Sequence, residues 1–328
     1  MGLAESVRLL PHRTMRSLLI SLSHRRSLAR LAVRSPLTRP VVARFVAGER
    51  LEEALAAIEV LKRAGLRTTV DVLGESVTSA DEADAASARY VETLAALAAA
   101  NLDANVSVKL TQMGLGIDRE LCRANVLRIL GAAGSARGFV RFDMEDHTRT
   151  DATLALWEEA HAAYEQTGVV IQAALRRSVS DVERIIAVGG RVRLCKGAYD
   201  EPRSVAYASK AAVDANYERL MERLLLSGMY PALATHDSKL IARAIEFTTR
   251  ERIGTDRFEF QMLYCVRRDL QRRLVAKGYT VRIYVPYGRE WYPYYMRRLA
   301  ERPANVGFML RAILKEEGRR LRGADRRR

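Results

Sequence analysis

Two adjacent arginines, Arg297 and Arg298, lie in an aromatic-rich stretch that runs from Tyr284 to Glu301. Guanidinium groups bind a carboxylate or a phosphate through paired hydrogen bonds, and the neighbouring rings can exclude water from such an anion. The stretch therefore suits a small, partly apolar anion. The alternative is a C-terminal helix with a packed aromatic face and solvated arginines, and the composition of the stretch favours neither interpretation.

Other polar side chains stand where predicted β-strands end. They are Glu75, Lys109, Asp143, Gln172, Arg193, Lys196, Thr235, His236, Gln261 and Tyr284. Buried charges need partners, so packing alone rarely explains ionisable groups at such positions. If the strand ends converge, the cations outnumber the acids there and suit an anionic cofactor together with a carboxylate substrate. The alternative is a ring of structural ion pairs, for example Lys109 with Asp143.

The elements that would position these residues alternate regularly along the chain. β-branched runs predict strands at 66–73, 105–110, 138–144, 169–173, 192–196, 231–235, 258–263 and 280–285. Apolar residues at helical spacing predict helices at 51–64, 81–100, 118–130, 151–166, 180–187, 205–226, 239–250 and 267–277. Eight strand–helix units are typical of a (β/α)8 barrel, in which catalytic groups sit at the carboxyl ends of the strands. A doubly wound Rossmann sheet is the alternative, but Gly-x-Gly-x-x-Gly is missing after the first strand.

The charge of the chain is concentrated at its ends. The 328 residues carry 54 Lys and Arg against 39 Asp and Glu, a net charge of +15. We predict a basic helical leader over residues 1–47, a catalytic barrel over 48–316 and a basic tail over 317–328. A basic amphipathic leader can lie on an anionic membrane surface; the alternative is that it packs on the barrel with its arginines in water.

Few other classes of protein fit the composition. No apolar run could span a bilayer and no signal peptide is evident, which predicts a cytoplasmic protein with, at most, a peripheral contact at the inner face of the membrane. The three cysteines are far apart and the five histidines are scattered, so we expect neither a disulfide framework nor a metal site.

An ordered set of motifs resembles a known family. The motifs are Arg44–Glu49, Asp71–Glu75, Val106–Leu110, Arg193–Tyr199, Ala234–Asp237, Phe258–Leu263 and Tyr284–Glu301. Over about residues 44–310 the chain is similar to the monofunctional bacterial proline dehydrogenases. The resemblance implies a distorted (β/α)8 TIM-type barrel with extra N-terminal helices. It also implies FAD as cofactor, oxidation of L-proline to 1-pyrroline-5-carboxylate by hydride transfer to flavin N5, and a quinone as the electron acceptor. One departure is Cys265, where the family often has glycine.

The resemblance also implies roles for individual residues around the substrate. Arg297, Arg298 and Lys109 would hold the proline carboxylate. Leu263 and Tyr284 would form walls around the pyrrolidine ring. The implied catalytic group consists of Lys109, Asp143, Arg193 and Tyr199, with Arg193 as the donor to flavin N5. Glu75 would be a gate that closes over the substrate by pairing with Arg297.

Further residues would contact the cofactor. The implied contacts are Gln172, Arg193, Lys196, Gly197, Ala198, Thr235, His236 and Glu301, the last of them also a groove residue that meets the ligand or orients an arginine.

Two other functions compete with this one. A Schiff-base aldolase or lyase on the same barrel would use Lys196 or Lys109 as its nucleophile, but it leaves the stretch around Arg297 and Arg298 without a specific role. A nucleic-acid-binding protein would use the basic termini, and it leaves the strand-end residues idle. We therefore expect no nucleic-acid partner.

Overall fold

The computed structural model describes residues 45–292, 294 and 296, and the predicted leader and tail lie outside these residues. Within the described residues, eight parallel strands close into a barrel in chain order, because β8 pairs with β1. The strands are β1 Arg67–Val72, β2 Asn105–Val108, β3 Phe139–Phe142, β4 Thr167–Gln172, β5 Arg191–Cys195, β6 Ala232–Ala234, β7 Glu259–Leu263 and β8 Val281–Tyr287. The predicted (β/α)8 barrel is confirmed, and the Rossmann alternative is wrong.

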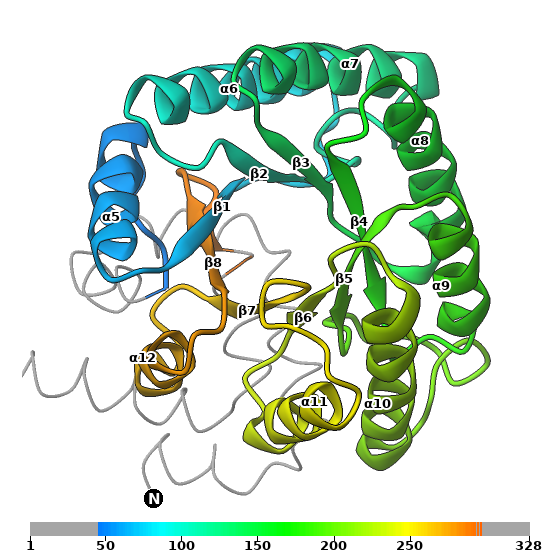
Figure 1. Cartoon of the computed structure of the whole chain (residues 1–328). Helices are drawn as coiled ribbons and strands as arrows, with labels where there is room; N and C mark the ends of the chain where they lie inside the picture. The colour runs from blue at the N-terminus through cyan, green and yellow to red at the C-terminus, as the bar shows by residue number, and fades with distance from the viewer. Residues whose placement is uncertain (1–44, 293, 295, 297–328) are drawn as a thin grey trace, which may run out of the picture.

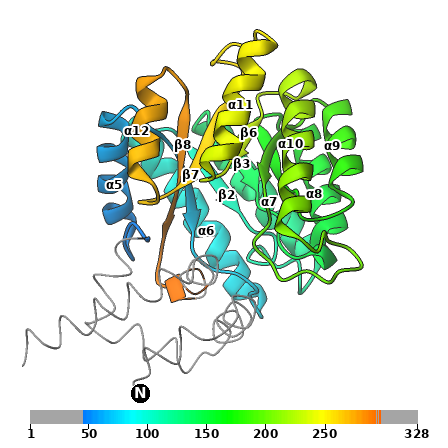
Figure 2. The ribbon, with the colours of Figure 1, turned by 90° about the horizontal axis from the view of Figure 1, so that it is seen from below.

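Helices surround the barrel on its outside (Figure 1), and the view along a perpendicular direction shows them running beside the strands (Figure 2). They are α5 Leu51–Arg63, α6 Ala80–Ala99, α7 Arg119–Ser135, α8 Thr150–Ala163, α9 Ser178–Ala187, α10 Lys210–Ser227, α11 Ser238–Arg250 and α12 Arg268–Ala276, with a 3-10 turn η2 at His147–Arg149. Helix α5 precedes the first strand and packs against both β1 and β8. It therefore covers the seam where the barrel closes.

The interior of the barrel is polar at the end away from the mouth. Arg282 on β8 donates to Glu259 on β7 at 2.8 Å, to Asp103 at 2.5 Å and to the carbonyl of Thr68 at 2.7 Å. Burial alone would raise the pKa of Glu259, but the charge and hydrogen bond of Arg282 outweigh burial and lower it. The pair is thus ionised and joins the two strands from inside.

Arg141 on β3 enters the same region and explains a glycine. Its guanidinium donates to the carbonyl of Arg191 at 2.7 Å. A Cβ on Gly168 would lie 2.3 Å from this guanidinium and 2.5 Å from the Arg191 carbonyl oxygen. Because both neighbours are held, only glycine fits at this position of β4.

The predicted helix at 205–226 was wrong at its start. Helix α10 begins at Lys210, where the side chain of Ser209 accepts a hydrogen bond from the backbone of Ala212. Residues 205–207 instead pair with the loop that follows β4: Ala206 forms an antiparallel bridge to Leu175, and the Tyr207 amide donates to Ala174. Helical spacing cannot reveal this pairing, since the partner loop is distant in the sequence.

Strand β8 runs two residues beyond its predicted end at 285, through Pro286. A proline lacks an N–H and usually ends a strand. Here β7 ends at Leu263, so no ladder bond from the nitrogen of Pro286 is lost on that side. The Pro286 carbonyl accepts from Ala47 at 2.8 Å, and the Gly288 amide donates to Gly48 at 2.9 Å. The segment before α5 thus extends the pairing of β8 towards the mouth of the barrel.

Candidate active site

A cavity of about 740 Å³ opens at the carboxyl ends of the strands. The predicted site residues that line it are Lys109, Asp143, Arg193, Lys196, Gly197, Ala198, Tyr199, Thr235, His236, Leu263 and Tyr284. Of the residues predicted at strand ends, the cavity brings together Lys109, Asp143, Arg193, Lys196, Thr235, His236, Gln261 and Tyr284. Glu75 and Gln172 are described but do not line the cavity, whereas Arg297, Arg298 and Glu301 lie outside the described residues.

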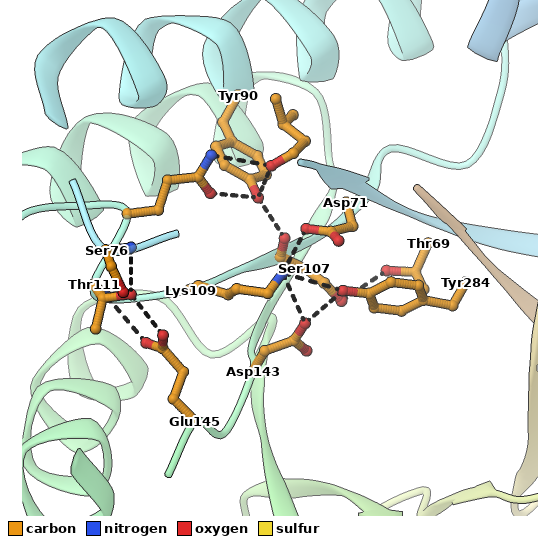
Figure 3. Close-up of polar contacts among 12 residues, drawn as sticks. Thr69, Asp71, Ser76, Tyr90, Ser107, Lys109, Thr111, Asp143, Glu145 and Tyr284 are labelled. Atoms are coloured by element: carbon orange, nitrogen blue, oxygen red, sulfur yellow. Dashed lines mark hydrogen bonds and ion pairs between the residues drawn. The ribbon is translucent and has the colours of Figure 1, made fainter. Parts of the chain in front are cut away.

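Four side chains on one wall of the cavity form a hydrogen-bonded cluster, in which Lys109, Asp143 and Arg193 are buried and Tyr284 is half-buried. Figure 3 shows three of them, Lys109, Asp143 and Tyr284. Asp143 accepts from Arg193 at 2.8 Å through one oxygen and from the Tyr284 hydroxyl at 2.8 Å through the other. Lys109 lies 3.4 Å from the Tyr284 hydroxyl and 3.9 Å from Asp143. The Arg193 guanidinium also stacks over the Tyr284 ring at 5.3 Å. Each member therefore restrains the others, which fixes their geometry before any ligand binds.

Asp71 is the site residue that our sequence reasoning missed. It lies within β1, has no exposed surface, and accepts a hydrogen bond from the Lys109 ammonium at 2.8 Å. Its second carboxylate oxygen has no hydrogen-bond partner among the described residues. An acidic residue inside a β-branched strand was a usable signal, since such a residue must face a partner in the interior.

The titration behaviour of Lys109 follows from this pairing. Burial alone would lower the pKa of Lys109, but the negative charges of Asp71 and Asp143 outweigh it, and the pKa is raised. Lys109 is therefore an ammonium ion at neutral pH. A Schiff-base lysine needs a neutral amine and a lowered pKa, so this result disfavours Lys109 as the nucleophile of an aldolase.

Tyr284 remains a neutral phenol. Burial, and after it the charge of Asp143, raises its pKa well above the ordinary value. The hydroxyl therefore keeps its proton and donates a hydrogen bond to Asp143. The ring of Tyr284, together with Leu263, gives this wall an apolar face beside the Lys109 charge.

A second arm of the cavity is basic. Lys196 at the end of β5 pairs with Asp237 at 2.9 Å and with Asp214 at 2.5 Å, and Lys210 also binds Asp214. Burial alone would raise the pKa of both carboxyl groups, but the hydrogen bonds of Lys196 reverse the effect and lower it. The lining on this side continues with Lys239 and Arg267. The arm suits phosphate groups or another extended anion.

Two predicted residues of this arm also support the backbone around it. The imidazole of His236 accepts a hydrogen bond from the Leu263 amide at 2.9 Å, and the hydroxyl of Thr235 accepts from the Asp237 amide at 3.1 Å. The first bond links the ends of β6 and β7, and the second holds the turn that follows β6. Nearby, Cys265 has a φ of 57°, in the left-handed region that glycine adopts readily. The loop therefore keeps a glycine-like conformation with a cysteine in it.

Gln172 braces the cavity from behind. Its side-chain amide donates to the carbonyl of Glu145 at 2.8 Å, and its oxygen accepts from the Ala198 amide at 3.4 Å. Gly197 beside it has a φ of +115°, and a Cβ there would lie 3.0 Å from Ala174. Gln172 thus shapes the loop that carries Gly197 and Ala198. Its predicted contact with the cofactor stays a prediction.

A closed (β/α)8 barrel with buried, mutually restrained ionic groups in a deep cavity at the carboxyl ends of its strands defines an enzyme of the TIM-barrel class. The family model described as proline dehydrogenase matches residues 54–311. The chain belongs to the proline dehydrogenase family, as its motifs predicted.

Named relatives of similar length share much of the sequence. Proline dehydrogenase of Deinococcus radiodurans is 42% identical over 277 residues, which cover 83% of this chain and 89% of that protein. Proline dehydrogenase 1 of Bacillus subtilis subsp. natto is 38% identical over 302 residues, which cover 92% of this chain and all of that protein.

Solved structures of a larger protein contain a similar barrel. The structure of proline utilization A from Bdellovibrio bacteriovorus inactivated by N-propargylglycine matches with a TM-score of 0.76 and 28% identity. The match covers 83% of this chain but only 34% of that one. The present chain therefore corresponds to about a third of proline utilization A.

None of the helices in the described part of the chain is both long enough and apolar enough to cross a membrane.

Proposed function

We propose that this protein oxidises L-proline to 1-pyrroline-5-carboxylate, the first step of proline catabolism, with FAD as its cofactor and a quinone as the electron acceptor. The observation that carries the proposal is the wall of the cavity on which the Lys109 ammonium stands beside the ring of Tyr284 and beside Leu263. A charged group next to an apolar face fits a ligand that has a carboxylate on a small hydrocarbon ring. Membership of the family implies a flavin.

The residues of the cavity fit a flavin. Two buried polar atoms in residues of the lining have no hydrogen-bond partner among the described residues: the Nε of Arg193 and the side-chain oxygen of Gln261. One is a donor and the other an acceptor, as the edge of a heteroaromatic ring with alternating nitrogens and oxygens requires. Arg193 would donate to the ring from Nε, because its other two nitrogens bind Asp143 and Ser107. The basic arm around Lys196 would hold the phosphates.

The chain's own residues prepare the substrate for oxidation. When bound, the flavin supplies the hydride acceptor. Proline must have a neutral amine when a hydride leaves the adjacent carbon, and a cation near the substrate lowers the pKa of that amine. Lys109 supplies one such cation, and the resemblance adds Arg297 and Arg298. Asp143 holds Tyr284 and Arg193 in place, while Tyr199 supports the site from the lining. Closure of Glu75 over the ligand would exclude water.

An anaerobic titration of the purified, flavin-loaded protein with L-proline tests the proposal. We expect the flavin absorbance to bleach as proline is added and 1-pyrroline-5-carboxylate to accumulate in proportion. Protein that takes up no flavin after reconstitution, or a flavin spectrum that proline leaves unchanged, would contradict it. Borohydride trapping of a substrate on Lys196 would instead support the aldolase.

Arg298→Lys should raise the KM for proline by about 10- to 100-fold while flavin content stays unchanged. Lysine keeps the positive charge but loses the planar fork that binds a carboxylate through two hydrogen bonds, and a charge-assisted hydrogen bond contributes about 1.5–3 kcal/mol. Steady-state kinetics and the flavin-to-protein absorbance ratio measure both quantities. An unchanged KM would remove Arg298 from the proposed carboxylate site.

The basic leader over residues 1–47 would bring the barrel to a membrane that contains the quinone, since nine arginines precede residue 48. Flotation with anionic liposomes measures this contact. Removal of residues 1–40 should abolish co-flotation at low salt, and neutral liposomes serve as the control. Equal flotation of the full-length and shortened chains would show that another surface binds the membrane.

A further inference from the structure

The loop between β1 and α6 carries the gate residue Glu75 and has an unusual backbone. The next residue, Ser76, has a φ of 51°, which is costly for a residue with a Cβ. Gly74 lies so close to the side chain of Gln112 that a Cβ would be 2.5 Å from its nitrogen. Such a conformation persists only where neighbouring groups hold it, and held strain of this kind often marks a moving part of a site.

One group that holds Ser76 is a buried hydroxyl on another loop. The Ser76 amide donates to the Thr111 hydroxyl at 3.1 Å. Thr111 follows β2 and is 6% exposed. Its hydroxyl in turn donates to one oxygen of Glu145 at 2.5 Å, and its amide donates to the other oxygen at 3.1 Å. Figure 3 shows the three residues in this order.

The carboxylate of Glu145 decides the direction of this chain of hydrogen bonds. A carboxylate only accepts, so the single proton of the Thr111 hydroxyl must point towards Glu145. The lone pairs of the hydroxyl are then left for the Ser76 amide. An amide in place of the Glu145 carboxylate could donate to the Thr111 hydroxyl and rotate it. The hydroxyl proton would then face the Ser76 amide, so that two donors would oppose each other.

The chain of hydrogen bonds continues to the other side of the cavity. The Glu145 carbonyl accepts from Gln172, and Gln172 accepts from the amide of Ala198 in the loop that follows β5. Of these linking side chains, Gln172 has a role in the proposed reaction, whereas Thr111 and Glu145 have none. The connection therefore joins the gate loop to a loop of the predicted cofactor site through fixed, buried groups.

We propose that Thr111 and Glu145 form a positioning pair that holds the backbone at Ser76 in its present conformation and thereby places the neighbouring gate residue Glu75 for closure over the substrate. The gate itself rests on the proposed function. The hydrogen bonds that restrain the Ser76 backbone do not rest on the proposed function, because residues of the protein alone make them.

Thr111→Val tests the pair, since valine keeps the shape but removes the hydroxyl. If the ordered loop becomes a minor conformation, the apparent affinity for proline falls by the fraction that remains competent. Loss of the two hydrogen bonds of the hydroxyl corresponds to a rise of about tenfold in the KM for proline, with kcat at saturation little changed. Amide hydrogen exchange of the flavin-loaded protein should become faster at residues 74–78 and stay unchanged in the barrel strands.

Three further variants complete the experiment. Thr111→Ser keeps the hydroxyl and should restore both the KM and slow exchange. Glu145→Gln should speed exchange at residues 74–78 even if Thr111→Val fails to fold. Thr248→Val is a matched control, because among the described residues this buried hydroxyl binds only the carbonyls of its own helix, Ala244 and Ile245, and it should change neither quantity.

The outcomes separate the two proposals. Unchanged exchange at residues 74–78 in both Thr111→Val and Glu145→Gln overturns the positioning pair, as does an unchanged KM in Thr111→Val. A wild-type protein that does not oxidise proline overturns the proposed function, while the exchange measurement still decides whether Thr111 and Glu145 hold the loop.

Discussion

Asp71→Asn should add to the use of proline a pH dependence that the wild-type protein lacks. The ratio of kcat/KM in the variant to that in the wild type is expected to fall by about 10- to 100-fold between pH 6 and pH 9. A fall of this size corresponds to the loss of one charge-assisted hydrogen bond to the substrate carboxylate. Taking the ratio cancels the ionisation of proline itself. The cause is Lys109, whose ammonium lies 2.8 Å from the Asp71 carboxylate.

The direction follows from the charges around Lys109. Burial alone would lower its pKa, and the carboxylates of Asp71 and Asp143 raise it. Asparagine keeps the shape and one acceptor but leaves Asp143, whose oxygen is 3.9 Å away, and the smaller contribution of Glu75. The pKa of Lys109 therefore falls in the variant. As pH rises through this lower value, the ammonium loses its proton and the substrate carboxylate loses a cation.

The same substitution should lower the free energy of unfolding by about 3 kcal/mol at neutral pH, because a buried charge loses its closest partner. In the wild type the folded pKa of Lys109 lies above the unfolded value, so its stabilising contribution is complete at neutral pH and is lost only as pH rises through the folded pKa. In the variant we expect burial to prevail, which brings the folded pKa of Lys109 below the unfolded value. The free energy of unfolding of the variant then rises with pH between the folded and the unfolded pKa of Lys109. The difference in stability between the variant and the wild type should therefore narrow in this interval.

Glu259→Gln is the matched control for Asp71→Asn. It is also a buried carboxylate-to-amide change inside the barrel, but Glu259 pairs with Arg282 and does not line the cavity. Glu259 also accepts a hydrogen bond from the side-chain amide of Gln261 in the lining, and glutamine keeps an oxygen that can accept it. We expect it to lower stability and to leave the pH dependence of kcat/KM as in the wild type. A flat ratio for Asp71→Asn across pH 6–9 would mean that Asp71 does not set the charge of Lys109.

Arg282→Met should lower the free energy of unfolding by about 3–5 kcal/mol, the usual effect of removing one partner from a buried ion pair. The change leaves the 3% exposed Glu259 without its arginine and removes donors to Asp103 and to the carbonyl of Thr68. The melting temperature should fall by about 10 °C, given a shift of about 2–4 °C per kcal/mol for a domain of this size. Chemical denaturation and calorimetry measure these quantities.

The pH dependence of this loss has a defined sign. In the wild type the pKa of Glu259 is lowered from its ordinary value of 4.5, so its stabilising contribution is present above that value and is lost as pH falls through the folded pKa. Without Arg282, burial raises the pKa of Glu259. The difference in stability between the two proteins should therefore shrink towards acid pH.

A double variant separates the charge from the packing. Replacing both partners, as Arg282→Met with Glu259→Leu, removes the unpaired charge and should recover most of the lost stability. The kcat/KM of folded Arg282→Met should match the wild type, since the pair lies at the opposite end of the barrel from the cavity. A single variant as stable as the wild type would show that this buried pair contributes nothing to the fold.

The alternation of strands and helices could be predicted from local patterns, because each element shows its own period of apolar residues. The errors occurred where a distant partner decides the local structure. Residues 205–207 read as helix, but the loop around Leu175 pairs with them. Strand β8 continues through Pro286 because Ala47 binds its carbonyl. Neither contact has a signal in the neighbouring residues.

The positions of the site residues followed from the fold, but their partners did not. Charged residues at strand ends must meet once the strands form a parallel barrel, so Lys109, Asp143 and Arg193 could be placed together. Lys109 pairs with Asp71 more closely than with Asp143 because of the side chains that β1 and β2 turn inward. Gln172 braces the Ala198 loop because of the path that this loop takes in space.

The sequence by itself determined the barrel, the family and the edge of the barrel where the candidate site lies, because apolar periodicity and ordered motifs are local properties of the chain. Only the tertiary structure decided which charges are paired and buried. It brings Asp71 to Lys109, Thr111 to Glu145 and Arg282 to Glu259 across gaps of many residues. The physical reason is that Coulombic attraction, hydrogen bonding and desolvation depend on distance and burial in space, and separation along the chain measures neither.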